Sequence, residues 1–346
     1  MSATRPSGTG AVIALRFDGS RLWALDQTLL PWREQELELR GASEVAAAIK
    51  RLAIRGAPLI GVAAAYGVAL ELAGDPQPRA ALERACAELR VARPTAVNLA
   101  RAVDRVRAAA EAAGVGEESA AALAQAREIH CEETAASEAM AAHGADLLAG
   151  ARTLLTHCNT GALAAPGRGT ALAVVAELAD RGRLDGVLAC EARPLLQGAR
   201  LTVFELARLG IAHELVVDAA APGLIAGGGI DAVIVGCDRV AANGDVANKV
   251  GSYPLALAAR AGGIPFVVTG PTSTIDLGCG SGAEITIEER DADEVRSAAG
   301  APHTLPGTRC RNPAFDVTPA ALVTALVTER GVAQPVGAES ILALLR

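Results

Sequence analysis

Five short apolar runs, separated by segments of helical periodicity, constrain the fold of this chain more than any other feature. The runs cover residues 153–157, 186–190, 215–218, 232–236 and 266–269, and helices are expected at 169–181, 195–209 and 253–261, the last with Ser252 as its N-cap. Strands that alternate with helices pair in parallel, because each crossover helix returns the chain to the same end of the sheet. The second half of the chain therefore predicts a Rossmann-like, doubly wound parallel sheet.

The first half of the chain follows a different pattern. Residues 11–17 and 22–25 flank the turn sequence Asp18-Gly19-Ser20, which predicts a hairpin in a small β-sheet. From residue 43 to 148, apolar residues recur at helical spacing, with breaks at Gly56, Asp75-Pro76, Arg93-Pro94 and Gly114. The chain has 346 residues, more than one core usually supports, so we expect two domains. The predicted class is α/β, with a mainly helical domain and its small sheet at 1–148 and the Rossmann-like domain at 149–346.

Composition argues against several classes of protein. A net charge of -7 without a basic cluster is not typical of a nucleic-acid-binding surface. No run of about 18 apolar residues is present, and residues 1–6 lack the apolar segment of a signal peptide, so neither a membrane partner nor export is expected. Seven cysteines without a C-x-x-C pair predict reduced thiols. These features indicate a cytoplasmic protein.

Polar side chains follow the predicted strands, at the edge where open α/β sheets bind ligands. Cys158 follows the first strand and precedes a Gly-containing turn and a helix start, where the helix dipole favours a thiolate. Asp238 follows the apolar run 232–236, where burial favours the protonated form that a general acid requires. A structural alternative stays open for each, since Asp238 would also serve as an ion-pair partner of Arg239. Three other cysteines lie near strand ends or loops: Cys190, Cys237 and Cys279.

Two further segments are candidates for binding an anion. Asn243-Gly244 predicts a hairpin turn that returns Asn248 and Lys249 to the same edge. Lys249 is one of only two lysines in the chain, and a lysine among so many arginines suggests the need for a compact charge. Arg55-Gly56-Ala57-Pro58 predicts a helix start whose free N–H groups suit a phosphate, although an ordinary helix start explains the same residues. Arg93, at another helix entry, is a similar case.

Missing motifs narrow the chemistry. The sequence has no G-x-x-x-x-G-K-[ST] loop, no G-x-G-x-x-G after the first strand of the second half and no G-x-S-x-G elbow. Its five histidines include no pair at H-x-x-x-H or H-x-H spacing, so no metal is expected. The chemistry left is proton transfer by side chains on a phosphorylated small molecule, without a cofactor.

Six motifs occur in order along the chain. They are RGAP at 55–58, RPTAVN at 93–98, HCNTG at 157–161, RPLLQG at 193–198, GCDRVAANGDVANK at 236–249 and NPAFDVTP at 312–319. Together they resemble the methylthioribose-1-phosphate isomerase family, which shares a superfamily with the regulatory subunits of translation initiation factor 2B and with ribose-1,5-bisphosphate isomerase. The resemblance runs from about residue 45 to 331.

The resemblance implies an aldose-to-ketose isomerisation of 5-methylthioribose 1-phosphate in methionine salvage, by a homodimer that uses neither metal nor nucleotide. By the match of motifs, Cys158 and Asp238 carry the catalysis. The same match assigns substrate binding to Arg55, Gly56, Ala57, Arg93, Gln197, Asn248 and Lys249. Two alternatives stay open: an isomerase of a related sugar, 5-deoxyribose 1-phosphate or ribose 1,5-bisphosphate, and a regulatory protein that binds sugar phosphates without turnover.

Overall fold

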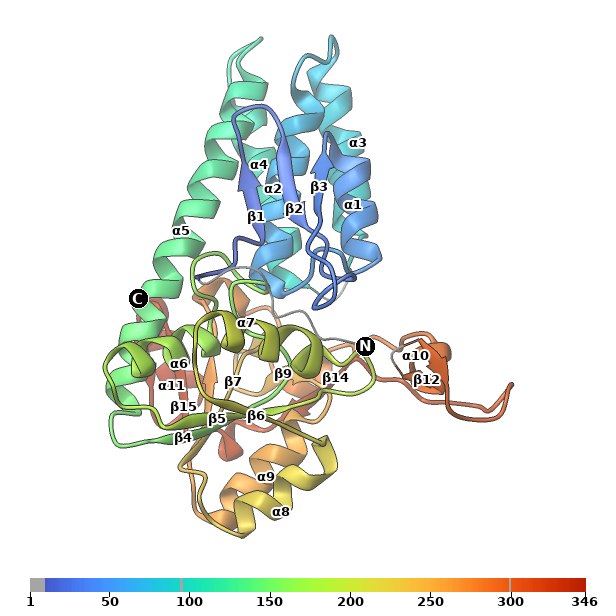
Figure 1. The fold of residues 1–346 in the computed structure, drawn as a ribbon. Coiled ribbons are helices and arrows are strands. Elements are labelled where there is room, and N and C mark those ends of the chain that lie inside the picture. The colour runs from blue at the N-terminus through green and yellow to red at the C-terminus, as the bar shows by residue number, and fades with distance from the viewer. Residues whose placement is uncertain (1–9, 94–95, 299) are drawn as a thin grey trace.

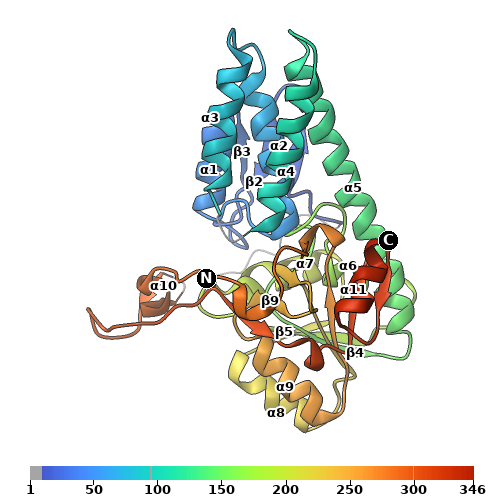
Figure 2. The same ribbon diagram turned by 180° about the vertical axis from the view of Figure 1, so that it is seen from behind.

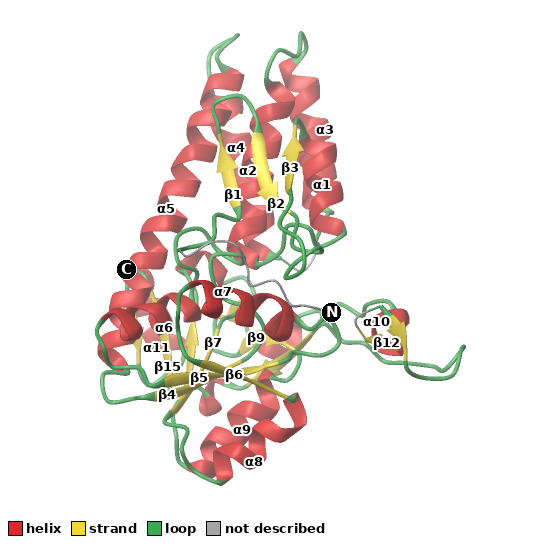
Figure 3. Cartoon of the chain, in the orientation of Figure 1, coloured by secondary structure: helices red, strands yellow, loops and turns green. Residues whose placement is uncertain are grey.

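The computed structural model describes residues 10–93, 96–298 and 300–346 (Figure 1). Pro94 and Thr95 of the second motif, and residues 1–6 considered above as a leader, lie outside the described residues. An upper lobe of helices with a small sheet stands on a lower lobe built around a large sheet (Figure 3). None of the helices in the described ranges has the length and apolar content needed to cross a membrane.

The upper lobe opens with a three-stranded antiparallel sheet of β1 (Leu15–Phe17), β2 (Leu22–Leu25) and β3 (Glu36–Leu39). The predicted hairpin is confirmed, because β1 pairs with β2 across the expected turn. Asp18 Oδ1 accepts hydrogen bonds from the backbone N–H groups of Ser20 (2.9 Å) and Arg21 (2.8 Å), which stabilises the turn.

Helices fill the rest of the upper lobe, and they end near the predicted breaks. They are α1 (Ala42–Lys50), α2 (Ala57–Leu72), α3 (Pro78–Arg90), α4 (Val97–Ala112) and α5 (Glu118–Leu147). Proline stands in the first turn of α2 and of α3, where its missing N–H has no helical partner to lose. The mainly helical N-terminal region is therefore confirmed.

The last of these helices, α5, belongs to both lobes. Ala122, Ala126 and Ile129 of its first half pack in the core of the upper lobe. Met140 and Ala145 of its second half pack with α6 (Ala171–Asp180) in the core on one face of the large sheet, and the helix runs visibly from one lobe into the other (Figure 1). The division into residues 1–148 and 149–346 stays a prediction.

A seven-stranded sheet forms the lower lobe, in the order β16-β15-β10-β7-β4-β5-β6. All its strand pairs are parallel except β15 with β16. The chain leaves β4 first towards β5 and β6 and later towards β7, β10 and β15, so the predicted doubly wound topology is confirmed. The strands are β4 (Thr153–Thr156), β5 (Gly186–Cys190), β6 (His213–Val216), β7 (Ala232–Val235), β10 (Phe266–Thr269), β15 (Ala325–Thr328) and β16 (Gly331–Ala333).

Helices cover the sheet on both faces (Figures 1 and 2). They are α6 (Ala171–Asp180), α7 (Val203–Arg208), α8 (Ala221–Ala226), α9 (Ser252–Gly262) and α11 (Ala338–Leu345). A side arm carries α10 (Ala292–Arg296) and the short pair β12 (Ser297–Ala298) and β13 (Ala301–Pro302).

Three elements differ clearly from the prediction. Strand β1 begins at Leu15, although the predicted run begins at residue 11. Strand β6 begins two residues before the predicted run, because it is an edge strand whose pairing with β5 starts at the polar His213. The helix expected at 195–209 begins instead as a π-helical turn, Gly198–Thr202, before α7. Gly198 lies so close to the carbonyl of Cys190 that any Cβ there would overlap it, and this close approach accompanies the wider turn.

A second, four-stranded sheet in the order β11-β8-β9-β14 carries part of the candidate site. The predicted Asn243-Gly244 turn is confirmed between β8 (Arg239–Ala241) and β9 (Val246–Lys249). Strand β14 (Phe315–Thr318) pairs antiparallel with β9 and sets Phe315 opposite Lys249, while β11 (Ile275–Asp276) pairs with β8.

The predicted N-cap of α9 is wrong. Gly251 occupies the N-cap position, with φ 108°, and Ser252 is the first helical residue. Asp316 of β14 replaces the cap, since its carboxylate accepts hydrogen bonds from the backbone N–H groups of Gly251 (2.7 Å) and Tyr253 (3.0 Å). A carboxylate from another strand thus satisfies the start of this helix.

Candidate active site

A small cavity between the lobes gathers most of the residues predicted for the site. It is lined by Leu52, Arg55, Gly56, Arg93, Cys158, Leu195, Gln197, Asp238, Lys249, Arg290 and Phe315. The upper lobe supplies Arg55, Gly56 and Arg93, and the edge of the large sheet supplies Cys158 and Asp238. Residues far apart in the sequence therefore meet around one space.

Two predicted residues lie outside this lining. Ala57 lines an adjoining small cavity, which also contacts Asp238 and Arg93. Asn248 lines none of these cavities: its side chain is 5% exposed, and its amide donates to Ser252 Oγ at 2.8 Å. Ser252 Oγ in turn donates to the carbonyl of Lys249 at 2.7 Å. Asn248 therefore supports the turn that follows Lys249.

Cys158 follows β4 in an unusual backbone conformation. Its φ is 64°, in the left-handed region that a non-glycine residue rarely adopts. Its carbonyl accepts a hydrogen bond of 2.5 Å from Thr202 Oγ1, which anchors the turn to the π-helical segment. The helix that follows this strand, α6, begins only at Ala171, so its start is not directly after Cys158. The segment between them folds back on itself, because the N–H of Thr170 donates to the carbonyl of Thr160 at 2.8 Å.

Asp238 lies just beyond β7, and burial raises the pKa of its carboxyl group. The nearby cations Lys249, Arg93 and Arg55 oppose this rise. The direction is the one expected from its position after an apolar strand. A carboxyl group with a raised pKa keeps its proton to higher pH and can donate it to a ligand.

Cationic side chains dominate the rest of the cavity wall. Burial lowers the pKa of Lys249, and the neighbouring Cys158 and Asp238 oppose this effect. The Lys249 ammonium lies 5.2 Å from the ring centroid of Phe315. Arg93 forms an ion pair of 3.2 Å with Glu288, and its side chain is 15% exposed. Such a wall suits an anionic ligand.

Arg55 is positioned by a buried polar network that the sequence did not reveal. Its guanidinium donates to Asn159 Oδ1 (2.5 Å) and to the Asn159 carbonyl (3.0 Å). The Asn159 amide donates to Glu205 Oε1 at 2.7 Å. Beside Arg55, Gly56 has φ 94° and lies against Ala164, where a Cβ would overlap the backbone, so only glycine fits.

This network predicts a pH dependence of stability. Burial raises the pKa of Glu205 from 4.5 to about 7. Below pH 4.5 the group is protonated in both the folded and the unfolded chain. As the pH rises towards 7, only the unfolded chain ionises freely at this residue. The free energy of unfolding therefore falls by about 3 kcal/mol, at about 1.4 kcal/mol per pH unit.

Glu205→Gln should remove this loss, since glutamine does not titrate. Urea unfolding of both proteins at pH 4.5 and pH 7.5 measures the effect. We expect the stability of the wild type, relative to the variant, to fall by about 3 kcal/mol between the two values. An unchanged difference would contradict the raised pKa.

The cavity also contains residues that sequence reasoning did not assign to the site. Arg290 carries a further guanidinium, paired with Glu288 (2.8 Å) and Glu294 (2.5 Å). Phe315 belongs to a recognised motif, but only the pairing of β14 with β9 brings its ring beside Lys249. Leu52 and Leu195 complete the wall. Nothing in the local sequence around Arg290 signals its place.

The shared cavity measures about 50 Å³. On this measure one water molecule needs about 10–15 Å³, so the cavity holds only a few water molecules. A cavity of about 340 Å³ adjoins it and shares Leu52, Arg55, Leu195, Gln197 and Arg290 with it. A ligand the size of a sugar phosphate would therefore have to extend into the adjoining space.

A larger cavity of about 770 Å³ lies between α2, α4 and α5 and the loop after β10. Burial raises the pKa of one of its acids, Glu133, to about 7. None of the predicted site residues lines it. We place the candidate site in the smaller cavity because a thiol, an acid and several cations converge there.

Comparisons with known proteins point in one direction. Residues 53–335 match the model of the Initiation factor 2 subunit family. The chain is 49% identical over 333 residues to methylthioribose-1-phosphate isomerase of Albidiferax ferrireducens, covering 94% of each protein. It is 52% identical over 311 residues to that of Anaeromyxobacter sp., covering 89% of each.

Two solved structures have the same fold. One is 5-methylthioribose 1-phosphate isomerase from Pyrococcus horikoshii, with a TM-score of 0.90, 37% identity, and coverage of 97% of this chain and 96% of that one. The other is the delta subunit of translation initiation factor eIF-2B from A. fulgidus, with a TM-score of 0.84, 37% identity, and coverage of 96% and 100%.

Proposed function

Since the chain belongs to the Initiation factor 2 subunit family, we propose that it is a methylthioribose-1-phosphate isomerase, which converts 5-methylthioribose 1-phosphate into 5-methylthioribulose 1-phosphate in methionine salvage. The observation that carries this proposal is the near-complete match, at about half identity, to relatives of that name. It is supported by a thiol, a carboxyl group and a cationic wall around one cavity.

In the proposed mechanism, Asp238 opens the sugar ring. A sugar phosphorylated at C1 cannot open as a free hemiacetal does, so the ring oxygen must be protonated while the C1–O phosphate bond stays intact. The protonated carboxyl group of Asp238 donates this proton and the bond from C1 to the ring oxygen breaks. The raised pKa of Asp238 supports this role.

Cys158 then moves a proton between the two carbons. Its thiolate removes the proton from C2, which gives an enol that still carries the phosphate, and returns a proton to C1. The Asp238 carboxylate accepts the O2 proton as the C2 carbonyl forms. Both groups end in their starting protonation states. A hydride shift from C2 to C1 is the rival route, and it leaves Cys158 without a part in the transfer.

The cationic wall is proposed to bind the phosphate, with Lys249 as its buried point charge. Replacing Lys249 by methionine should raise KM about 30-fold, since one charged hydrogen bond is worth about 2 kcal/mol. Steady-state kinetics measure this change. Methionine has a volume similar to that of lysine, so the fold should be preserved, and circular dichroism of the variant checks this.

Lys50→Met is the matched control, since Lys50 lies at the exposed end of α1 and lines only the outer cavity. We expect its KM to stay within about twofold of the wild type, as for most surface substitutions. A raised KM in Lys50→Met together with an unchanged KM in Lys249→Met would place the phosphate in the outer cavity and contradict the assignment.

The space around Asp238 supports a methylthio group at C5 over a second phosphate. The cavity that adjoins Asp238 is also lined by Arg93 and Arg239, but most of its other side chains are apolar: Ile60, Ala96, Ala247, Ile285 and Phe315. The arginines of the outer cavity have internal partners. Arg51 pairs with Asp26 at 2.9 Å, and Arg200 donates to the carbonyl of Gln27 at 2.7 Å. A 5-phosphate would have to compete with these partners.

A regulatory protein without turnover is the second candidate, because a relative named as an initiation factor subunit is 37% identical. Carbon NMR of the purified protein with methylthioribose 1-phosphate separates the two. A ketone signal at C2 supports the isomerase. Binding of the sugar phosphate by calorimetry without any ketone would favour the regulatory protein. The homodimer and the cytoplasmic location stay predictions.

A further inference from the structure

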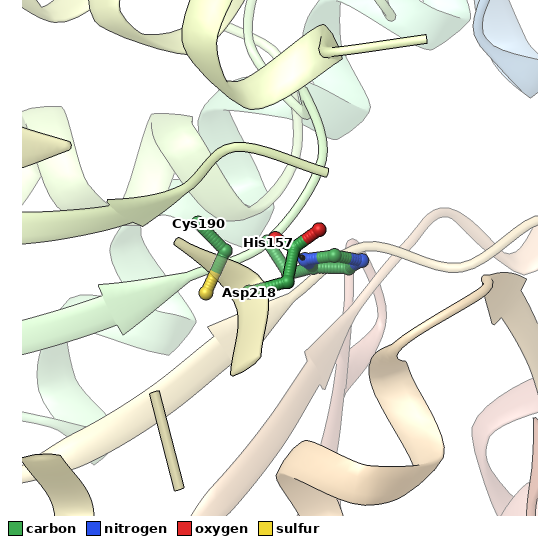
Figure 4. Close-up of side chains that lie close together, drawn as sticks. All are labelled: His157, Cys190 and Asp218. Carbon is green, nitrogen blue, oxygen red and sulfur yellow. Dashed lines mark ion pairs between the residues drawn. The ribbon is translucent and has the colours of Figure 1, made fainter. Parts of the chain in front are cut away.

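Three side chains that could bind a metal meet where β4, β5 and β6 end side by side. His157 follows β4, Cys190 is the last residue of β5, and Asp218 comes two residues after β6. One imidazole nitrogen, the thiol sulfur and one carboxylate oxygen all lie within 4.8 Å of one another. Figure 4 shows the three side chains close together where their strands end.

The imidazole of His157 presents a lone pair to this space. Its Nε2 lies 2.8 Å from the carbonyl of Val250, so Nε2 carries a proton and donates it. With Nε2 as the donor, the neutral ring leaves Nδ1 as an acceptor. Nδ1 has no hydrogen-bond partner, although the ring is 1% exposed.

The nearest charged group to Nδ1 is itself an acceptor. Asp218 Oδ1 lies 3.8 Å from Nδ1, too far for a hydrogen bond. The Asp218 carboxylate is held in place by the backbone N–H groups of Ala192 (2.8 Å) and Arg193 (2.7 Å). A cation between the buried Nδ1 and the partly buried carboxylate would satisfy both acceptors.

We propose that His157 Nδ1, Cys190 Sγ and an Asp218 oxygen bind a divalent metal ion of the zinc class. Nitrogen, sulfur and carboxylate oxygen are the ligands that zinc takes, and the bond from Nε2 to the Val250 carbonyl orients the ring as in known zinc sites. The Asp218 side chain is 29% exposed and offers a route from solvent.

Binding displaces the thiol proton of Cys190 into solvent. The search for closely spaced histidine pairs in the sequence could not detect this site. The three ligands follow three different strands, and only the folded sheet brings them together.

The metal has a positioning role near the proposed catalytic cysteine. None of its three ligands lines the substrate cavity within the described ranges. His157 immediately precedes Cys158, and the Asp218 carboxylate accepts a hydrogen bond from the N–H of Ala192. Cys158 and Ala192 both adopt positive φ values, 64° and 60°. A metal that joins the three strand ends would stabilise these strained turns.

Cobalt titration of the metal-stripped full-length protein tests the site. We expect one Co²⁺ per chain and a thiolate-to-cobalt charge-transfer band in the near ultraviolet. Cys190→Ala should lose the band and weaken binding at least about tenfold. Cys158→Ala is the matched control, because its thiol is adjacent to His157, and it should keep the band.

Thermal unfolding provides a second readout that does not depend on the thiol. Zn²⁺ should raise the Tm of the wild type and leave that of His157→Gln unchanged. Cobalt binding without a charge-transfer band in the wild type, or a band that persists in Cys190→Ala, would overturn the proposal. Neither experiment uses isomerase activity, so its outcome is independent of the proposed function.

Discussion

Replacing Asp238 by asparagine is expected to lower kcat by about a thousandfold, the middle of the range for loss of a general acid. Asparagine has the same shape but cannot donate a proton to the ring oxygen, so the sugar ring stays closed. KM should change much less, since the cationic wall is intact. Steady-state kinetics on the wild type and the variant, with the ketose product followed by NMR, measure both constants.

The pH profile of the wild type supplies a second measurement for the same residue. Burial raises the pKa of Asp238, and the protonated form is the active one. On the alkaline side of the profile, the value of kcat should therefore decline as the pH rises through that pKa. Asp276→Asn, which alters a carboxylate 3.7 Å from Arg239 and away from the cavity, is the control and should keep most of the activity. Equal losses in both variants would sink the assignment.

Cys158→Ala is expected to lower kcat by about a hundredfold to ten-thousandfold, because no other group would carry the proton from C2 to C1. A reaction of the wild type in deuterium oxide should introduce deuterium at C1 of the product, which proton NMR detects. The thiol exchanges its proton with solvent before the proton is returned, and this exchange is the source of the label.

Cys237→Ala separates this role from a general need for a thiol near Asp238. Burial raises the pKa of Cys237 to about 12, so that thiol stays protonated and takes no part in proton transfer. This variant should keep most of its kcat. Full turnover by Cys158→Ala, with no deuterium in the wild-type product, would favour the hydride shift instead.

Much of the fold follows from periodicity. The alternation of short apolar runs with helical segments predicts the parallel sheet, and the breaks at glycine and proline predict where the helices of the upper lobe begin. Prediction from local sequence fails where a residue far away in the sequence determines where an element begins. Asp316 caps α9 from another strand, so Ser252 does not, and the exposed edge strand β6 begins at a polar residue that hydrophobicity does not reveal.

The residues of the candidate site also fall into two groups, those that a sequence pattern indicates and those that only the folded chain brings together. The strand-end rule makes Cys158 and Asp238 candidates, the family resemblance selects them, and both line the same cavity. Arg290 and Glu205 could not be found in this way, because the first reaches the site from a separate loop and the second acts through Asn159. Their contributions depend on contacts between segments that have no common local pattern.

The long helix α5 has a consequence for how the protein melts. One continuous rod supplies side chains to two hydrophobic interiors, so disorder in one interior removes support from the other. Heating should therefore produce a single cooperative transition and not two separate ones. A protease that nicks this helix near its middle would uncouple the two halves.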